Sequence, residues 1–149
     1  MNIVIKKVEC TETKFLAYYK QEDNITLDSN LYQQDSGFPV GFIAIEEQTN
    51  RVLGAGMLID QEMYAHMSEI YDTKKTDTNP WMVGLLVNES NRNKGIGKKI
   101  VDVMINYCNE LGYHKLNLNT ETAKNFYEKY WEMECLSSYT ITNDKKEEQ

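Results

Sequence analysis

The segment from residue 92 to residue 98 has the residue types and spacing of a site for a charged ligand. It reads Arg92-Asn93-Lys94-Gly95-Ile96-Gly97-Lys98 and opens a segment whose apolar periodicity predicts a long helix. Glycines let the backbone approach a ligand closely, and the first N–H groups of a helix have no acceptor within the helix. The helix dipole and the basic side chains add to the attraction for anions. The segment therefore predicts a phosphate-binding site.

Two common phosphate-binding loops do not fit these residues. A dinucleotide-binding fingerprint requires a third glycine where Ile100 stands. A nucleoside-triphosphate loop ends in Gly-Lys followed by Ser or Thr, whereas Lys99 follows Lys98 here and offers no hydroxyl group to magnesium. The pattern therefore indicates a different phosphate-containing ligand.

Strands and helices alternate around this segment. Strands are predicted where apolar residues alternate or run without interruption, over residues 2–9, 40–45, 51–60, 81–87, 115–119 and 133–142. Helices are predicted where apolar residues recur every three or four positions, over residues 11–20, 27–34 and 95–111 and in a last segment that ends at residue 130.

Some boundaries can be predicted more closely. Thr11 is expected to cap the first helix, and the polar turn between the second and third strands predicts an antiparallel hairpin. Residues 61–79 show only a partial helical spacing. The order of elements predicts one α/β domain with a mixed sheet over residues 1–142, followed by a charged tail over 143–149.

Composition restricts the class of protein. The 149 residues are 41% hydrophobic and 26% charged, which is typical of a folded globular domain. The net charge of −7 argues against nucleic acid as a partner and is compatible with a cationic substrate such as an amine. No apolar run approaches the roughly 20 residues that span a membrane, and no signal peptide is recognisable, so we expect a cytoplasmic location. The cysteines and histidines lack metal-ligand spacing, which predicts no metal site.

The pattern Arg-x-x-Gly-x-Gly at residues 92–97 resembles the acetyl-CoA pyrophosphate loop of the GNAT superfamily of N-acetyltransferases. Residues 80–132 follow the order of motifs in that family, and residues 1–79 follow it by element order alone. The resemblance implies a mixed central sheet that splays between its fourth and fifth strands and is flanked by about four helices. It also implies acetyl-CoA as cosubstrate and a primary amine as acceptor.

The resemblance assigns roles to particular residues. The pantetheine arm would pair with the backbone of the fourth strand like an added strand, and the loop would bind the pyrophosphate. The residues that would bind the cofactor are Leu85, Leu86, Val87, Arg92, Asn93, Lys94, Gly95, Ile96, Gly97, Lys98, Asn119 and Thr120. Tyr127 matches the tyrosine that donates a proton to the departing CoA thiolate in many members, and packing in the core is the alternative role for it.

Two positions depart from the family pattern. Thr120 stands where the family usually has an asparagine that contacts the pantetheine arm, and Asn119 is the candidate substitute. The usual glycine after the tyrosine helix is missing, since Tyr130 leads directly into Trp131. Together with the apolar stretch that follows, Trp131 predicts a terminal strand that packs on a second subunit, so we expect a homodimer.

The acceptor and the general base are not defined by these patterns. Glu62, Glu69 and Asp72 are candidate bases, although each is more typical of a solvated surface residue. Aromatic residues that could line an acceptor pocket are Tyr18, Tyr19, Tyr32, Tyr64 and Tyr71. Two other functions stay open: an acetyl-CoA-binding regulatory or sensor domain of the same fold without turnover, and a protein-interaction module whose loop binds another anion.

Overall fold

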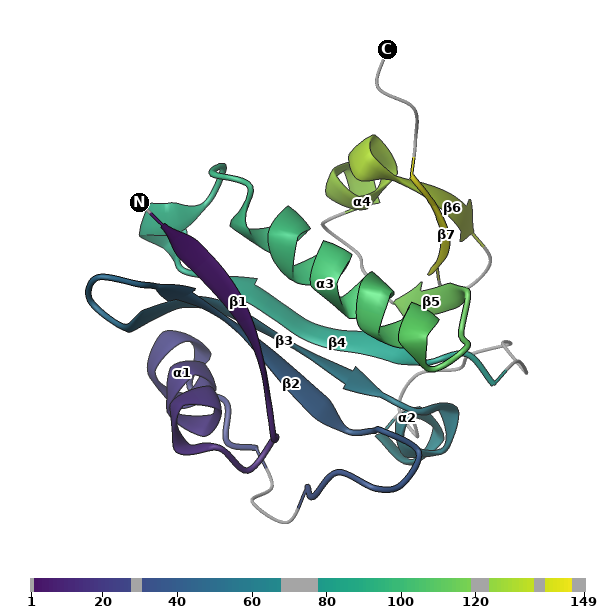
Figure 1. Ribbon diagram of the computed structural model, residues 1–149, viewed down its shortest axis with the longest axis horizontal. Coiled ribbons are helices and arrows are strands. Elements are labelled where there is room, and N and C mark those ends of the chain that lie inside the picture. Colours follow the sequence, from purple (N-terminus) through teal and green to yellow (C-terminus); the bar gives the residue numbers. More distant parts are fainter. Residues whose placement is uncertain (1, 28–30, 68–77, 119–123, 136–138, 146–149) are drawn as a thin grey trace. The chain divides into compact units, whose positions relative to one another are not determined.

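The computed structural model describes residues 2–27, 31–67, 78–118, 124–135 and 139–145 (Figure 1). By their contacts the residues form two compact units. The first unit is drawn from Met1–Leu58 and Gly84–Met104, and the second from Ile59–Val83 and Ile105–Gln149.

The described elements alternate along the chain as the sequence predicts for an α/β protein. The strands are β1 Ile3–Val8, β2 Val40–Glu46, β3 Arg51–Ile59, β4 Trp81–Val87, β5 Lys115–Leu118, β6 Trp131–Cys135 and β7 Tyr139–Lys145. The helices are α1 Thr13–Asp23, α2 Gln61–Met67, α3 Ile96–Glu110 and α4 Lys124–Tyr130, with a short 3-10 turn, η1, at Glu89–Asn91. The strand β4 and the helix α3 contribute residues to both units.

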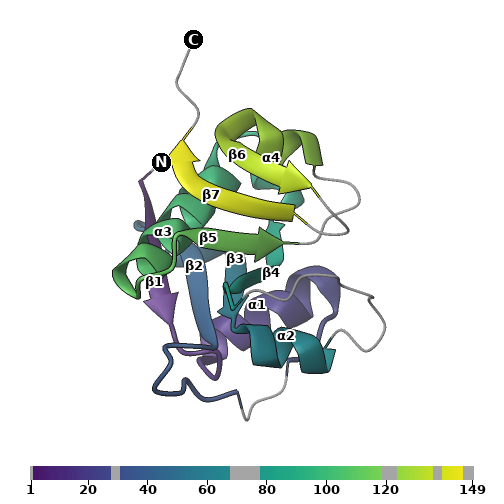
Figure 2. The same ribbon diagram turned by 90° about the vertical axis from the view of Figure 1, so that its right-hand side faces the viewer.

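The sheet of the first unit has the strand order β1-β2-β3-β4. β1 pairs antiparallel with β2, and β2 pairs antiparallel with β3, which confirms the predicted hairpin. Figures 1 and 2 show α1 and the first part of α3 on opposite sides of these strands. The two helices therefore cover both faces of the sheet, and β4 is held between them.

Glycines in the sheet let both helices pack closely. A Cβ atom at Gly41 would lie 2.7 Å from the ring of Phe15 in α1. On the other face, a Cβ atom at Gly54 would lie 3.3 Å from Cγ2 of Ile96 in α3. Ile96 and Ile100 are fully buried, as expected from the apolar stripe predicted for this helix.

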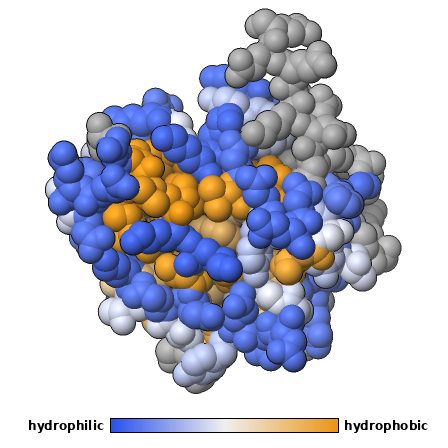
Figure 3. Space-filling view, viewed as in Figure 1, coloured by the Kyte–Doolittle hydropathy of each residue, from blue (hydrophilic) through white to orange (hydrophobic). Residues whose placement is uncertain are grey.

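The edge strand β1 and the start of α3 share one face of the first unit. Figure 3 shows a group of apolar side chains over this part of the surface, bordered by hydrophilic ones. The apolar side chains at the start of β1 are only half-buried, which is usual for an edge strand with one neighbour.

The prediction for the helices is partly wrong before residue 40. α1 is capped by Glu12, whose carboxylate accepts the N–H of Lys14, and not by Thr11. The helix predicted over 27–34 is absent from residues 31–34, and residues 28–30 lie outside the described part. There the chain turns back on itself, because the N–H of Gln34 bonds to the carbonyl oxygen of Phe38 and the N–H of Gly37 bonds to that of Gln34. These bonds replace the i→i−4 ladder that a helix needs.

The sheet of the second unit has the strand order β4-β5-β7-β6. β5 is parallel to β4, and its described residues pair with β4 at Trp81↔Asn117. β7 is antiparallel to both of its neighbours, and Figure 2 shows it between β5 and β6 with α4 alongside. The mixed sheet and the four described α-helices confirm the predicted fold class.

The helix α2 lies within residues 61–79, for which the sequence shows only a partial helical spacing. Its Tyr64 ring stacks on the indole of Trp81 in β4 with 3.6 Å between the ring centroids. The indole N–H of the fully buried Trp81 donates to the side-chain oxygen of Gln61 at 2.6 Å. This stack joins α2 to the first residue of β4.

The end of the chain differs from the prediction of one strand over residues 133–142. It forms two strands, β6 and β7, which pair antiparallel at Met133↔Ile141. β7 continues to Lys145 and so includes the first three residues of the predicted tail. No glycine separates α4 from β6. The Trp131 ring, 1% exposed, instead packs near Phe126 and Tyr127 at the junction.

Candidate functional site

The turn after β4 is held in place by Asn88. This residue is 4% exposed, and its side-chain oxygen accepts the hydroxyl of Tyr18 at 2.7 Å. Its backbone N–H donates to the carbonyl oxygen of Leu53 in β3, and its own carbonyl oxygen accepts the N–H of Asn91. These bonds fix the position at which the chain leaves the sheet and enters the predicted phosphate loop.

The predicted loop turns the chain sharply from β4 into α3. Asn93 and Gly95 both have left-handed backbones, with φ of 63° and 79°. The first bond of the α3 ladder runs from the N–H of Lys99 to the carbonyl oxygen of Gly95 at 3.1 Å. The N–H groups just before Lys99 therefore precede that ladder and face the N-terminal end of the helix. Turns of this kind gather backbone N–H groups into a concave donor site for anions.

The basic side chains of the loop differ in their surroundings. Arg92 and Lys94 are exposed, and the Nε of Arg92 donates to the carbonyl oxygen of Val87 at 3.1 Å. Lys98 instead forms an ion pair with Asp102, one turn further along α3, at 2.7 Å. The two residues closest to the turn thus carry the positive charge, while the charge of Lys98 is balanced within the helix.

The strand β4 offers backbone groups beside the loop. Leu85, Leu86 and Val87 are half-buried, so this half of the strand is less covered than its apolar sequence predicts. Gly84 has a left-handed backbone with φ of 67°. Its carbonyl oxygen accepts the hydroxyl of Tyr19 at 2.6 Å.

The predicted general acid, Tyr127, lies on α4 in the second unit. It is 6% exposed and packs edge-on against Phe126, with ring centroids 5.1 Å apart. Burial raises the pKa of the Tyr127 hydroxyl to about 12. The hydroxyl therefore stays protonated at neutral pH, and it is a weaker acid than an exposed tyrosine.

The remaining predicted site residues are either outside the described residues or differ in their exposure to solvent. Asn119 and Thr120 lie outside the described residues, as do Glu69, Asp72 and Tyr71. Glu62 is exposed on α2. Of the aromatic residues predicted to line an acceptor pocket, Tyr18, Tyr19 and Tyr64 are buried, and Tyr32 is 62% exposed.

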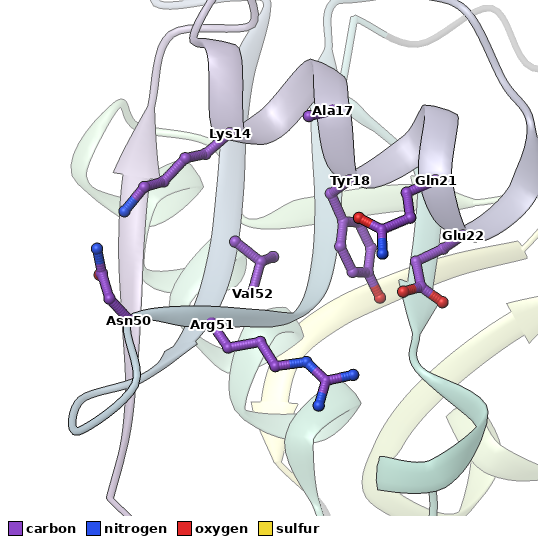
Figure 4. Close-up of a pocket in the computed structure, with 8 residues that line it drawn as sticks. All are labelled: Lys14, Ala17, Tyr18, Gln21, Glu22, Asn50, Arg51 and Val52. Carbon is purple, nitrogen blue, oxygen red and sulfur yellow. The ribbon is translucent and has the colours of Figure 1, made fainter.

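Two adjoining hollows lie beside α1 in the first unit. One encloses about 240 Å³ between α1 and the start of β3, and the other about 460 Å³ beside Asn88. Figure 4 shows the side chains of Arg51 and Glu22 extending toward the hydroxyl end of Tyr18. Because these charges have opposite signs, the hollows lack the single-sign field that would attract an anion.

Sequence reasoning missed Gly84, Asn88 and the hydroxyl of Tyr19 as parts of this site. The glycine within an apolar strand was the available signal, because glycine inside a strand often marks an irregularity of the backbone. Tyr19 carried no such signal, since its partner on β4 lies 65 residues away.

Comparison with known proteins identifies the class to which this fold and loop belong. Residues 8–131 match the Acetyltransferase (GNAT) family. The chain therefore belongs to the GNAT family of acetyltransferases, as the loop pattern predicted. A comparison with curated proteins gives no significant match.

Solved structures of acetyltransferases share the fold. NAA60 of Arabidopsis thaliana, in complex with a bisubstrate analogue, aligns with a TM-score of 0.64 and 14% identity over 94% of this chain and 96% of that one. An acetyltransferase of the GNAT family from Staphylococcus aureus aligns with a TM-score of 0.58 and 19% identity, over 95% and 100%. The aminoglycoside acetyltransferase HMB0005 from an uncultured soil metagenomic sample aligns with a TM-score of 0.62 and 13% identity, over 87% and 90%.

Clusters of metal ligands and membrane-spanning helices are both absent from the described ranges. Within them, no three side chains of His, Cys, Asp or Glu are grouped so that they could hold a metal ion. No helix in the same ranges has the length and apolar character needed to cross a membrane.

Proposed function

We propose that the protein transfers an acetyl group from acetyl-CoA to a primary amine of a small molecule or peptide. The observation that carries this proposal is the run of β4, left-handed turn and α3 in a member of the GNAT family. Residues 92–97 would hold the pyrophosphate through backbone N–H groups, with Arg92 and Lys94 adding charge. The backbone of Leu85 and Val87 would pair with the pantetheine arm.

The chemistry is a direct attack within a ternary complex. The amine nitrogen attacks the thioester carbonyl carbon, a C–N bond forms, the C–S bond breaks, and CoA leaves as a thiolate. The nitrogen loses one proton and the thiolate takes one up. Much of the rate enhancement would come from holding the two reactants in the correct orientation.

Tyr127 would assist the departing thiolate mainly as a hydrogen-bond donor. A thiol titrates near 8.5, and the pKa of Tyr127 is raised to about 12. Full proton transfer from this phenol to the thiolate is therefore uphill by roughly 5 kcal/mol, at 1.36 kcal/mol for each pH unit. A hydrogen bond to the sulfur requires no such transfer and still stabilises the developing charge.

A thiol-release assay tests the proposed function. Purified protein and acetyl-CoA are mixed with a panel of amines that includes a polyamine, an aminoglycoside, lysine and a peptide with a free amino terminus. Amine-dependent release of CoA, together with an acetylated product of the expected mass, would support the proposal. Absence of release from every amine, in protein that binds acetyl-CoA by calorimetry, would favour a sensor without turnover. Absence of acetyl-CoA binding would reject both functions.

A sensor function without turnover is the alternative. Tyr127 is 6% exposed, and burial raises the pKa of its hydroxyl, so it is a weaker acid than an exposed tyrosine. A protein that only binds acetyl-CoA would need the loop and β4 but no acid at this position.

A further inference from the structure

The helix α1 carries two adjacent tyrosines whose hydroxyls reach the backbone near β4. Tyr18 and Tyr19 are 5% and 3% exposed. Tyr18 lies 2.7 Å from the side-chain oxygen of Asn88, 3.2 Å from the carbonyl oxygen of Leu86 and 3.3 Å from that of Leu53. Tyr19 makes one bond of 2.6 Å, to the carbonyl oxygen of Gly84. Since a hydroxyl has a single proton, Tyr18 divides its donation among several acceptors, whereas Tyr19 directs it to Gly84.

The bond from Tyr19 sets the orientation of the peptide between Gly84 and Leu85. This peptide is trans and planar, so its N–H points opposite to its C=O. Because Tyr19 holds the carbonyl oxygen of Gly84, it also holds the N–H of Leu85, which lies on the opposite side of the same peptide. The ladder gives the direction of this N–H, since the N–H of Asn88 donates to Leu53 in β3. By alternation, the N–H groups of Leu85 and Val87 face the edge of β4 that is turned away from β3.

Gly84 makes this orientation dependent on Tyr19. A glycine adopts this φ of 67° at little cost, but it adopts many other φ values as easily. Without a partner for the carbonyl oxygen of Gly84, the peptide between Gly84 and Leu85 could rotate and turn the N–H of Leu85 away from this edge of β4. A Cβ atom at Gly84 would also lie 3.2 Å from the hydroxyl oxygen of Tyr19, so the glycine is what allows the close contact. Burial raises the pKa of Tyr19 above its ordinary value, which keeps the hydroxyl a donor.

We propose that Tyr19 is a positioning residue that holds the N–H of Leu85 outward, where it receives the carbonyl oxygen of the bound thioester. This inference rests on the proposed function, because it assumes that acetyl-CoA lies along this edge of β4. Tyr19 acts through the backbone and touches no substrate. The proposal predicts that the protein distinguishes acetyl-CoA from CoA through the hydrogen bond of the Leu85 N–H, and that this bond depends on Tyr19 of α1.

The test compares the affinities for acetyl-CoA and CoA by calorimetry in the whole protein. CoA lacks the thioester carbonyl, so it does not use the N–H of Leu85 in the proposed way. In Tyr19→Phe we expect the preference for acetyl-CoA over CoA to fall about two- to tenfold, the range of one ordinary hydrogen bond. A merely structural loss would weaken both ligands equally. Tyr107→Phe is the matched control, because it removes the same single atom from a half-buried tyrosine of α3 that has no predicted role in the site, and it should leave the preference unchanged.

The outcomes separate this inference from the proposed function. If the parent protein binds no acetyl-CoA, the proposed function is wrong and the inference falls with it. If the parent binds both ligands and folded Tyr19→Phe keeps the preference of the parent, only the inference is overturned.

A second measurement tests the Leu85 part of the inference, on which the role of Tyr19 depends, and needs no Tyr19 variant. In ¹⁵N-leucine-labelled parent protein, the Leu85 amide signal, identified with Leu85→Ile, should shift further downfield with acetyl-CoA than with CoA. Equal shifts with the two ligands would reject the inference.

Discussion

The conformation of Gly95 provides the sharpest test of the cofactor loop. Its φ is 79°, and a Cβ atom added there would meet no other atom within 4 Å. Gly95→Ala therefore introduces strain in the backbone without a clash inside the chain. A left-handed backbone costs an L-residue about 1–2 kcal/mol. In the unliganded variant the exposed loop can relax to a negative φ, and ligand binding must then restore the strained form. The affinity for acetyl-CoA should consequently fall about 5- to 30-fold.

Gly112 supplies a matched control for this change. It follows α3, has a φ of 91°, and also has no atom within 4 Å of an added Cβ. Gly112→Ala should lower the free energy of unfolding by about 1–2 kcal/mol, the cost of a left-handed backbone, and leave the acetyl-CoA affinity unchanged. Calorimetry with acetyl-CoA and thermal unfolding of both variants measure the two quantities. Equal acetyl-CoA affinities in the two folded variants would refute the assignment of the pyrophosphate to this loop.

Three other predictions concern catalysis and stability. Tyr127→Phe should lower turnover roughly 10- to 100-fold, because it removes one hydrogen bond to a charged sulfur, and acetyl-CoA affinity should change little. A loss of turnover above about 10³-fold would instead indicate full proton transfer. Gln61→Leu leaves the buried indole N–H of Trp81 without its acceptor, so the free energy of unfolding should fall by about 1–3 kcal/mol, and an unchanged thermal midpoint would contradict the bond. Burial raises the pKa of Cys10 and Cys108 to about 12. Because these thiols ionise first in the unfolded chain, the stability they contribute is complete below about pH 8.5 and is lost as the pH rises toward 12. Chemical denaturation at pH 8 and pH 10.5 checks this, and equal midpoints would count against buried thiols.

Burial of Trp131 removes one of the two reasons for predicting a homodimer from the sequence. Trp131 was expected to help form a surface for a second subunit, yet its side chain is 1% exposed within the chain. The aromatic cluster with Phe126 and Tyr127 accounts for the tryptophan at the start of β6. Dimerisation therefore stays a prediction that depends on the terminal strands alone, and sedimentation at micromolar protein concentration would test it.

The sequence was most informative where a short segment encodes its own structure. The helix predicted over 95–111 is α3 at Ile96–Glu110, because an apolar stripe lies between glycines at both ends. The hairpin of β2 and β3 was also predictable, since two alternating runs flank a polar turn. The helix predicted over 27–34 failed at residues 31–34, because side-chain and backbone bonds near Gly37 outweigh a weak local preference for helix.

The sequence by itself determined the family of the protein, and it predicts a phosphate loop because glycines, basic residues and a helix start lie within a few positions of one another. Only the tertiary structure decided which buried tyrosines meet β4, and that Gly84 rather than its apolar neighbours carries the left-handed turn. The tyrosine sequence Tyr18-Tyr19 is equally compatible with a core, a pocket or a bond to the backbone. The choice depends on a partner 65 residues away, and such contacts form only when α1 packs on the completed sheet.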